Sequence, residues 1–205
     1  MQLMDFILLL ASQKKDMQLH KSDLKGALEK LYDVLGPPRR SSNNKIVLNE
    51  SVIDRYLRSS INPLKLFNSL KGEGSLNTTE VSGLHAQVAA KGLYFTLGKI
   101  YLFPIKHQKR VGSIKPDDVE NAVRFFKYDL MCNANKWETW YRLGQTYEAQ
   151  MEDGQTWSAE QINTKRGELA VLERVCIAFS RQPHFPSNIS NQMLTSLCRK
   201  QYYVI

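Results

Sequence analysis

Apolar residues in the first third of the chain recur at the spacing of α-helices. Residues 3–10 carry one apolar stripe, and a second amphipathic helix is expected from Ser22, an N-cap candidate, through the segment DLKGALEKLYDVL. The first stripe consists of Leu3, Phe6, Ile7 and Leu10, and the second of Leu24, Ala27, Leu28, Leu31, Val34 and Leu35. Gly36-Pro37-Pro38 should end the second helix, because glycine accepts a left-handed cap and proline cannot continue a helix.

Helical spacing continues through the middle of the chain. A third helix is expected to begin near Asn49, and Pro63 interrupts it ahead of a short helix in PLKLFNSL. The apolar face of this third helix consists of Val52, Ile53, Tyr56 and Leu57. A long helix is then predicted from about Thr78 to Tyr101, where Pro104 ends it, and a basic loop leads to a further helix in KPDDVENAVRFFKYDL. Since hairpin signals are nearly absent, the predicted fold class is all-α.

The stretch WETWYRLGQTY contains a spaced motif that occurs twice. It follows the pattern W-x₂-L-G-x₂-Y of the first helix of a tetratricopeptide repeat, and YFTLGKIY repeats that pattern upstream. The motif residues are Trp140, Leu143, Gly144 and Tyr147, and before them Tyr94, Leu97, Gly98 and Tyr101. Offsets of 0, 3, 4 and 7 place all four side chains on one helical face, where the glycine permits close approach of a second helix. This predicts helix packing rather than an aromatic ligand cage, with Trp137 joining the core and Tyr141 and Arg142 facing outward.

The second helix of each repeat should show small and aromatic residues at set positions. Those positions hold Ala122, Phe126, Asp129 and Ala134 in the first repeat, and Val171, Val175, Ala178 and Pro183 in the second. Long insertions separate the two helices within each repeat, either as binding loops or as lengthened helices. We therefore expect a degenerate helical segment over residues 1–76 and a repeat-containing segment over 77–205, with repeats near 88–134 and 137–183. Together they would form one continuous solenoid fragment of a longer chain.

Composition adds charge to this picture. The 205 residues carry a net charge of +8 with a pI near 9.4, which favours acidic partners. The candidate binding residues are the local basic clusters, which comprise Arg39, Arg40, Lys106, His107, Lys109 and Arg110. Contact of these clusters with DNA or chromatin is one interpretation, and solvated loop residues are the other. No apolar run is long enough to span a membrane, so no membrane partner is expected.

Enzymatic motifs are missing from the sequence. The histidines at 20, 85, 107 and 184 are isolated, no HExxH or G-x-S-x-G pattern occurs, and the three cysteines have no metal-ligand spacing. Asp117 and Asp118 fit an acidic helix start better than a catalytic pair. We therefore expect that the chain is not an enzyme and that it binds no cofactor and no metal.

The segment VENAVRFFKYDLMCNANKWETWYRLGQTYEA, preceded by AKGLYFTLGKIYLFP, resembles a known family. It is similar to the tetratricopeptide region of the scaffold subunit of the HIR histone-chaperone complex, the third histone-regulation protein of fungi and the calcineurin-binding protein cabin of animals. The resemblance implies a nuclear, non-enzymatic scaffold that acts in replication-independent deposition of histones H3 and H4 and in transcriptional regulation. The implied partners are the WD-repeat subunits and, directly or indirectly, those histones. Asp129 departs from the repeat pattern, where a small residue is usual. Self-association into a homo-oligomer through an open end of the solenoid is a further expectation.

Overall fold

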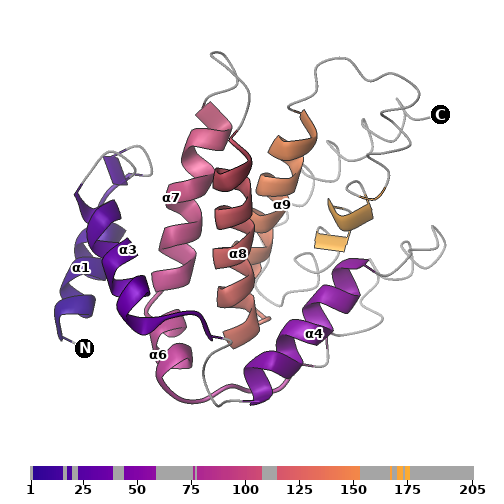
Figure 1. The fold of residues 1–205 in the computed structure, drawn as a ribbon, viewed down its shortest axis with the longest axis horizontal. Coiled ribbons are helices and arrows are strands. Elements are labelled where there is room, and N and C mark those ends of the chain that lie inside the picture. The colour runs from indigo at the N-terminus through magenta and orange to yellow at the C-terminus, as the bar shows by residue number, and fades with distance from the viewer. Residues whose placement is uncertain are drawn as a thin grey trace.

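The regular secondary structure of the chain is helical. A computed structural model describes residues 2–15, 18–19, 23–38, 44–58, 76, 78–107, 115–152, 167, 170–172 and 174–175. Within these ranges there are helices and no strand, which confirms the all-α prediction (Figure 1). The labelled helices are α1 (Gln2–Ser12), α3 (Leu24–Leu35), α4 (Asn44–Arg58), α6 (Leu84–Ala90), α7 (Leu93–His107), α8 (Pro116–Cys132) and α9 (Trp137–Glu152).

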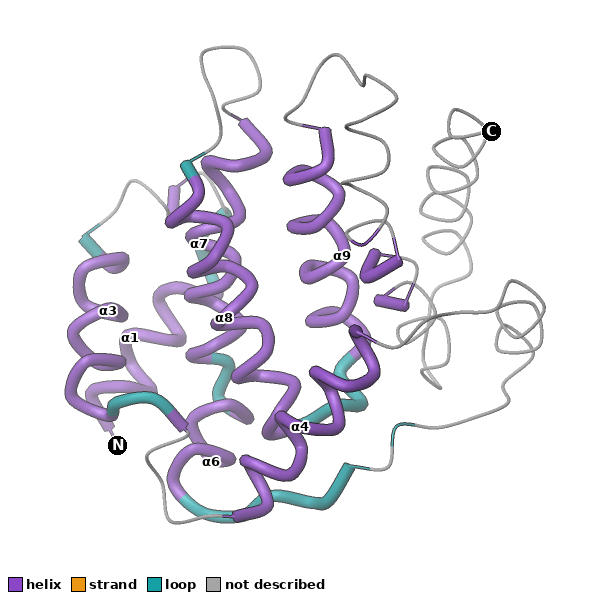
Figure 2. The backbone as a smooth tube through the Cα atoms, turned by 45° about the vertical axis from the view of Figure 1, so that its right-hand side comes forward, coloured by secondary structure: helices purple, strands orange, loops and turns teal. Residues whose placement is uncertain are grey.

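Helix α8 is the centre of the arrangement. It packs against α7 and α9, which lie on either side of it in Figure 1, and it also contacts α4 and α6. The pair formed by α1 and α3 lies beyond α7, whereas α4 lies on the other side of the molecule (Figures 1 and 2). Consecutive helices α3 and α4 are therefore separated by the α7–α8 pair. The ion pair between Lys127 Nζ and Asp54 Oδ1, at 2.5 Å, joins α8 to α4.

The core between α3, α7 and α8 is aromatic. The ring of Phe125 meets Tyr32 edge-on with centroids 4.9 Å apart, and it stacks on Tyr101 at 5.7 Å. Tyr94, with no exposed surface, meets the ring of Tyr128 at 5.8 Å. Such edge-to-face and offset contacts add to the burial of large apolar area. The Tyr101 hydroxyl also donates a hydrogen bond to Glu29 Oε1 at 2.6 Å, which fixes α7 against α3.

Helix α1 packs through a face that only partly overlaps the predicted one: Ile7 and Leu10 are half-buried, and Ile7 packs against the core, but Leu3 and Phe6 do not. Met4, Leu8 and Ala11 face the core and are 5%, 7% and 2% exposed, whereas Leu3 and Phe6 are 66% and 59% exposed. The segment QLMDFILLLAS is apolar on almost every side, so its spacing alone does not select the face that packs. In the same way Val34 of α3, predicted to be on the core face, is 88% exposed.

The predicted helix from Thr78 to Tyr101 is wrong in three respects. Residues 78–82 are not helical, and α6 and α7 are separated at Gly92, whose φ of +85° is a backbone conformation that favours glycine. Pro104 does not end the helix but lies inside α7, which continues to His107. A proline there removes one helical hydrogen bond, and the burial of Leu102 and Ile105 on either side offsets that loss.

Helix boundaries differ from the predictions by a few residues elsewhere. Helix α3 begins at Leu24 after Asp23, and α4 begins at Asn44, five residues before the predicted start. Gly36 ends α3 with a φ of +71° and donates its N–H to the Tyr32 carbonyl at 2.8 Å, which confirms the predicted glycine stop. Helix α8 begins with Pro116 and an acidic first turn, also as predicted. Ser22, Pro63, the PLKLFNSL segment and the KGEGSLN connection up to Gly74 lie outside the described residues.

No helix in the described part of the chain combines the length and the apolar character needed to cross a lipid bilayer.

Candidate binding site at the turn between α8 and α9

The repeat-motif residues lie in the interior of the α7–α8–α9 layer. Tyr94 and Leu97 on α7, Ala122 and Phe126 on α8, and Trp140 and Leu143 on α9 have no exposed surface. Gly98 and Gly144 are also buried, whereas Tyr101 and Tyr147 are half-buried. A Cβ atom built at Gly98 would lie 2.5 Å from Cε1 of the Phe126 ring. Helices α7 and α8 therefore approach closely at the position where the motif has its glycine.

The stretch WETWYRLGQTY is arranged for packing. The indole N–H of Trp140 donates to the Ala134 carbonyl at 2.7 Å, and its ring meets Tyr56 of α4 edge-on at 6.2 Å. The prediction that Tyr141 and Arg142 face outward is not met, because both are half-buried. The amide of Gln145 contacts both side chains: it donates to the Tyr141 hydroxyl at 2.8 Å and accepts from Arg142 at 3.2 Å. Trp137 is half-buried as well.

The basic candidate residues are not brought together by the described structure. Arg39, Arg40, Lys109 and Arg110 lie outside the described residues, as do Ala178 and Pro183 of the second repeat. Lys106 and His107 occupy the last two positions of α7, where only the backbone is described. Val171 is half-buried and Val175 buried.

A buried asparagine that sequence reasoning missed holds the chain ahead of α6. Asn49 of α4 is 2% exposed, and its Oδ1 accepts hydrogen bonds from the Thr79 N–H at 2.8 Å and from the Thr79 hydroxyl at 3.1 Å. Its Nδ2 donates to the Thr79 carbonyl at 2.8 Å and to the Met131 carbonyl at 2.9 Å. The side-chain amide thus pairs with the peptide groups of residue 79 as a neighbouring strand would. It also ties residues 78–82 to the end of α8.

A buried carboxylate lies at the same end of α8. Asp129 is 1% exposed, and its Oδ2 is 3.0 Å from Lys136 Nζ and accepts a hydrogen bond from the Thr139 hydroxyl at 2.5 Å. Burial raises the pKa of the Asp129 carboxyl above its ordinary value, although Lys136 and Thr139 act in the opposite direction. Lys136 also lies over the Phe95 ring, 4.5 Å from its centroid. These contacts fix the turn that joins α8 to α9.

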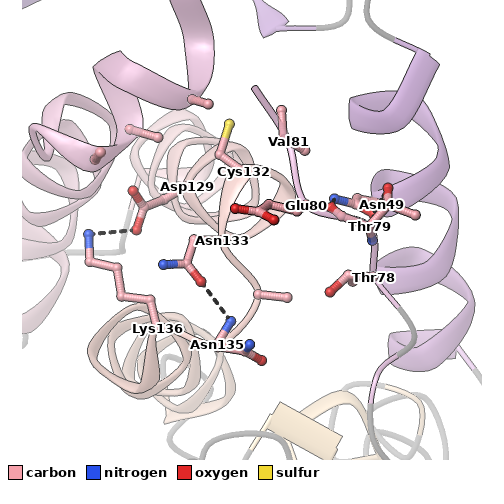
Figure 3. Close-up of a pocket in the computed structure, with 14 residues that line it drawn as sticks. Asn49, Thr78, Thr79, Glu80, Val81, Asp129, Cys132, Asn133, Asn135 and Lys136 are labelled. Carbon is pink, nitrogen blue, oxygen red and sulfur yellow. Dashed lines mark hydrogen bonds and ion pairs between the residues drawn. The ribbon is translucent and has the colours of Figure 1, made fainter. Parts of the chain in front are cut away.

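The asparagine and the carboxylate line one hollow, which Figure 3 shows. Its volume is about 690 Å³, and it lies between α6, the segment 78–81 and the α8–α9 turn. The lining residues are Asn49, Thr78, Thr79, Glu80, Val81, Ala86, Ala89, Ala90, Asp129, Cys132, Asn133, Ala134, Asn135 and Lys136. The lining is mainly polar, with alanines forming the wall on α6, so the hollow suits a ligand that forms hydrogen bonds.

Groups that could do covalent or metal chemistry beside this hollow are held in unreactive states. Burial raises the pKa of the Cys132 thiol to about 12, so the thiol stays protonated at neutral pH. His85 is 8% exposed, contacts the Tyr94 hydroxyl through Nδ1 at 2.7 Å, and has a pKa lowered by burial. Within the described ranges, no group of three or more His, Cys, Asp or Glu residues is placed to hold a metal ion.

Comparison with known proteins assigns the chain to a family. The family model of the HIR3 helical bundle domain matches residues 12–181. The chain belongs to the HIR3 helical bundle family. This confirms the resemblance drawn from the repeat-motif segments.

Fungal relatives agree with the assignment. The chain is 37% identical over 175 residues to the Histone transcription regulator 3 homolog of Aspergillus fumigatus, and the match covers 85% of the chain and 9% of that protein. It is 35% identical over 147 residues to the homolog of Aspergillus oryzae, covering 72% and 7%, and 27% identical over 164 residues to that of Candida albicans, covering 78% and 10%. The chain therefore spans about a tenth or less of the length of these relatives. All three relatives carry the name Histone transcription regulator 3 homolog.

The HIR3 helical bundle match includes every residue that lines the hollow, whereas α1 lies almost entirely outside it. Asn49 and Lys136 carried no sequence signal that pointed to a site. Asp129 did carry one, because it occupies a repeat position at which a small residue is usual.

Proposed function

We propose that this chain is a non-enzymatic scaffold segment that binds protein subunits of a nuclear histone regulatory complex. Membership of the HIR3 helical bundle family is the observation that carries the proposal, and the name of the relatives, Histone transcription regulator 3 homolog, supports it. The α7–α8–α9 layer suits this role, since its three helices all pack against one another. The buried motif residues Tyr94, Leu97, Trp140 and Leu143 fit a tetratricopeptide-like array in which packing, not ligand contact, fixes the motif.

The partners that fit this proposal are the WD-repeat subunits of the complex and, directly or through them, histones H3 and H4. The processes are replication-independent histone deposition and regulation of transcription. Two forms of the full-length protein test this, one intact and one lacking residues 12–181, expressed at equal levels as judged by immunoblot. The deletion should lower the recovery of the WD-repeat subunits on affinity purification at least several-fold. Equal recovery with both forms would refute a scaffold role for this segment.

Direct contact with DNA is the competing proposal, and the net charge of +8 favours it. Binding of a duplex oligonucleotide should then weaken steeply as salt is raised, and the double variant Lys109→Glu with Arg110→Glu should abolish it. Absence of binding at low salt would exclude this function.

A further inference from the structure

We propose that the hollow at the α8–α9 turn binds an extended segment of a partner polypeptide that carries a lysine or arginine side chain. The inference rests on the proposed scaffold function and names the kind of partner segment that this one site accepts. The volume of about 690 Å³ lies within the range of about 300–1,000 Å³ that is typical of ligand pockets. Three alanines on α6, at 86, 89 and 90, leave room along one wall.

Backbone recognition is inferred from polar groups of lining residues that have no hydrogen-bond partner among the described residues. Within the described structure, the backbone N–H and C=O groups of Glu80 and Val81 form no hydrogen bond, and neither does the side chain of Asn135. The Asn133 amide uses only its oxygen, which accepts the Asn135 N–H at 3.1 Å. Figure 3 shows Asn133 next to Glu80 in the lining of the hollow, with Asn135 on the far side of Asn133. An extended segment has an open row of N–H and C=O groups that could pair with these atoms.

The protein already uses this mode of recognition at the same place. Asn49 holds the peptide groups of Thr79 with two hydrogen bonds of 2.8 Å, one donated and one accepted. An asparagine amide has both a donor and an acceptor in one plane, so it can replace a neighbouring strand. Asn133 and Asn135 place the same chemistry on the opposite wall, facing the hollow instead of an internal segment.

The charge of the partner segment follows from the ionised groups in the lining. Lys136 and Asp129 neutralise each other at 3.0 Å, and Lys136 is further occupied by the Phe95 ring. Glu80 is exposed, and in the described structure it has no ion-pair partner. Among the described residues of the lining it is therefore the one carboxylate without a counter-charge, which selects a cationic side chain over an anionic one.

The experiment uses a displayed library of random twelve-residue peptides, selected on the immobilised 205-residue chain. We expect enrichment of peptides with a required lysine or arginine, and replacement of that residue by glutamine should weaken binding at least tenfold. Glu80→Gln should weaken the best peptide at least tenfold, and Asn135→Ala several-fold. Glu120→Gln, which changes an exposed carboxylate of α8 outside the lining, is the matched control and should leave binding unchanged.

Three results would overturn the inference: no enriched peptide, enriched peptides without a required basic residue, or equal binding to the wild type and Glu80→Gln. Because Glu80 and Asn135 are exposed, both variants should melt at the wild-type temperature, and this is checked by circular dichroism. Affinity purification of the full-length protein with and without residues 12–181 separates this inference from the scaffold function. Failure of the peptide tests, together with subunit recovery that still depends on residues 12–181, removes the hollow but leaves the scaffold role.

Discussion

The contact between Gly98 and Phe126 gives a sharp test of the packing of α7 on α8. Replacing Gly98 by alanine adds one methyl group, whose carbon would lie 2.5, 2.6 and 2.8 Å from three atoms of the Phe126 ring. The ring cannot move into solvent, because Phe126 has no exposed surface, and it also contacts Phe95, with centroids 6.2 Å apart. The added methyl group therefore forces a shift of the helices or a strained ring rotamer.

The expected magnitude comes from two opposing effects. Overpacking of a core costs about 1–3 kcal/mol, and three contacts below 3.0 Å at Gly98 place this substitution in the upper half of that range. Alanine gains about 1 kcal/mol over glycine inside a helix. We therefore expect Gly98→Ala to lower the free energy of unfolding by about 1–2 kcal/mol, the difference of these two effects. For a chain of this size that corresponds to a drop in Tm of roughly 5 °C.

Gly26 of α3 provides the matched control. It lies in a helix, is exposed, and has nothing within 4 Å of the position that a Cβ would take, so Gly26→Ala adds helix propensity without a clash. It should raise the free energy of unfolding by about 0.5–1 kcal/mol. Urea denaturation followed by circular dichroism measures both variants. The double variant Gly98→Ala with Phe126→Leu should be more stable than the sum of the single changes predicts, because leucine lacks the colliding ring atoms. The reasoning is refuted if Gly98→Ala is as stable as the wild type or if the two changes are additive.

Four further substitutions test the remaining contacts by denaturation. Asn49→Ala should destabilise the chain by about 2–4 kcal/mol, since it removes the hydrogen-bond partner of three backbone groups, the Thr79 N–H, the Thr79 carbonyl and the Met131 carbonyl. A loss below about 1 kcal/mol would contradict the role given to this amide. Lys136→Met should cost about 3 kcal/mol at pH 7, because Asp129 is left as an unpaired buried charge. Burial raises the pKa of Asp129 in the folded state above its unfolded value. Once the carboxyl is protonated it is no longer an unpaired charge, so the loss of stability in Lys136→Met should shrink as the pH falls from about 7 towards 4. A loss that does not change with pH would refute the explanation by the Asp129 charge. Leu8→Ala should cost about 2–5 kcal/mol but Phe6→Ala less than about 0.5, because only Leu8 is buried. Equal losses would contradict the packing face of α1 described above.

The helices could be predicted from the sequence because apolar spacing and stop signals reflect local physics. Gly36 ends α3 as expected, and Pro116 with its acidic neighbours begins α8. Local spacing fails where several faces are equally apolar, as in α1, and where a single backbone conformation decides the outcome. Gly92 breaks the predicted long helix through its positive φ, which no neighbouring residue announces. Pro104 is tolerated inside α7, since burial around it outweighs one lost hydrogen bond.

The hollow could not be predicted, because its parts come from distant places in the chain. Asn49 reaches Thr79 across 30 residues and Met131 across 82, so no motif connects them. The sequence did mark Asp129 as a departure from the repeat pattern. Its ion-pair partner Lys136, however, lies outside α8, in the connection between α8 and α9. Spacing within one helix cannot show such a pair. What the motif could predict was the packing between helices, which depends on residues that lie on one helical face.

The departure at Asp129 bears on what the hollow can bind. A small residue at this position would avoid the free-energy cost of burying a charge. The carboxylate therefore destabilises the fold unless it has a compensating effect. Its effect is to hold Lys136, which lines the same hollow as Glu80. In Asp129→Asn the lysine loses its counter-charge and adds a net positive charge to the lining that contains Glu80. That variant should therefore weaken basic peptides of the selected set as Glu80→Gln does, although Glu80 is intact. Lys136→Met combined with Asp129→Asn removes the competing lysine and should restore binding, and unchanged binding in Asp129→Asn would show that Lys136 does not control the charge of the site.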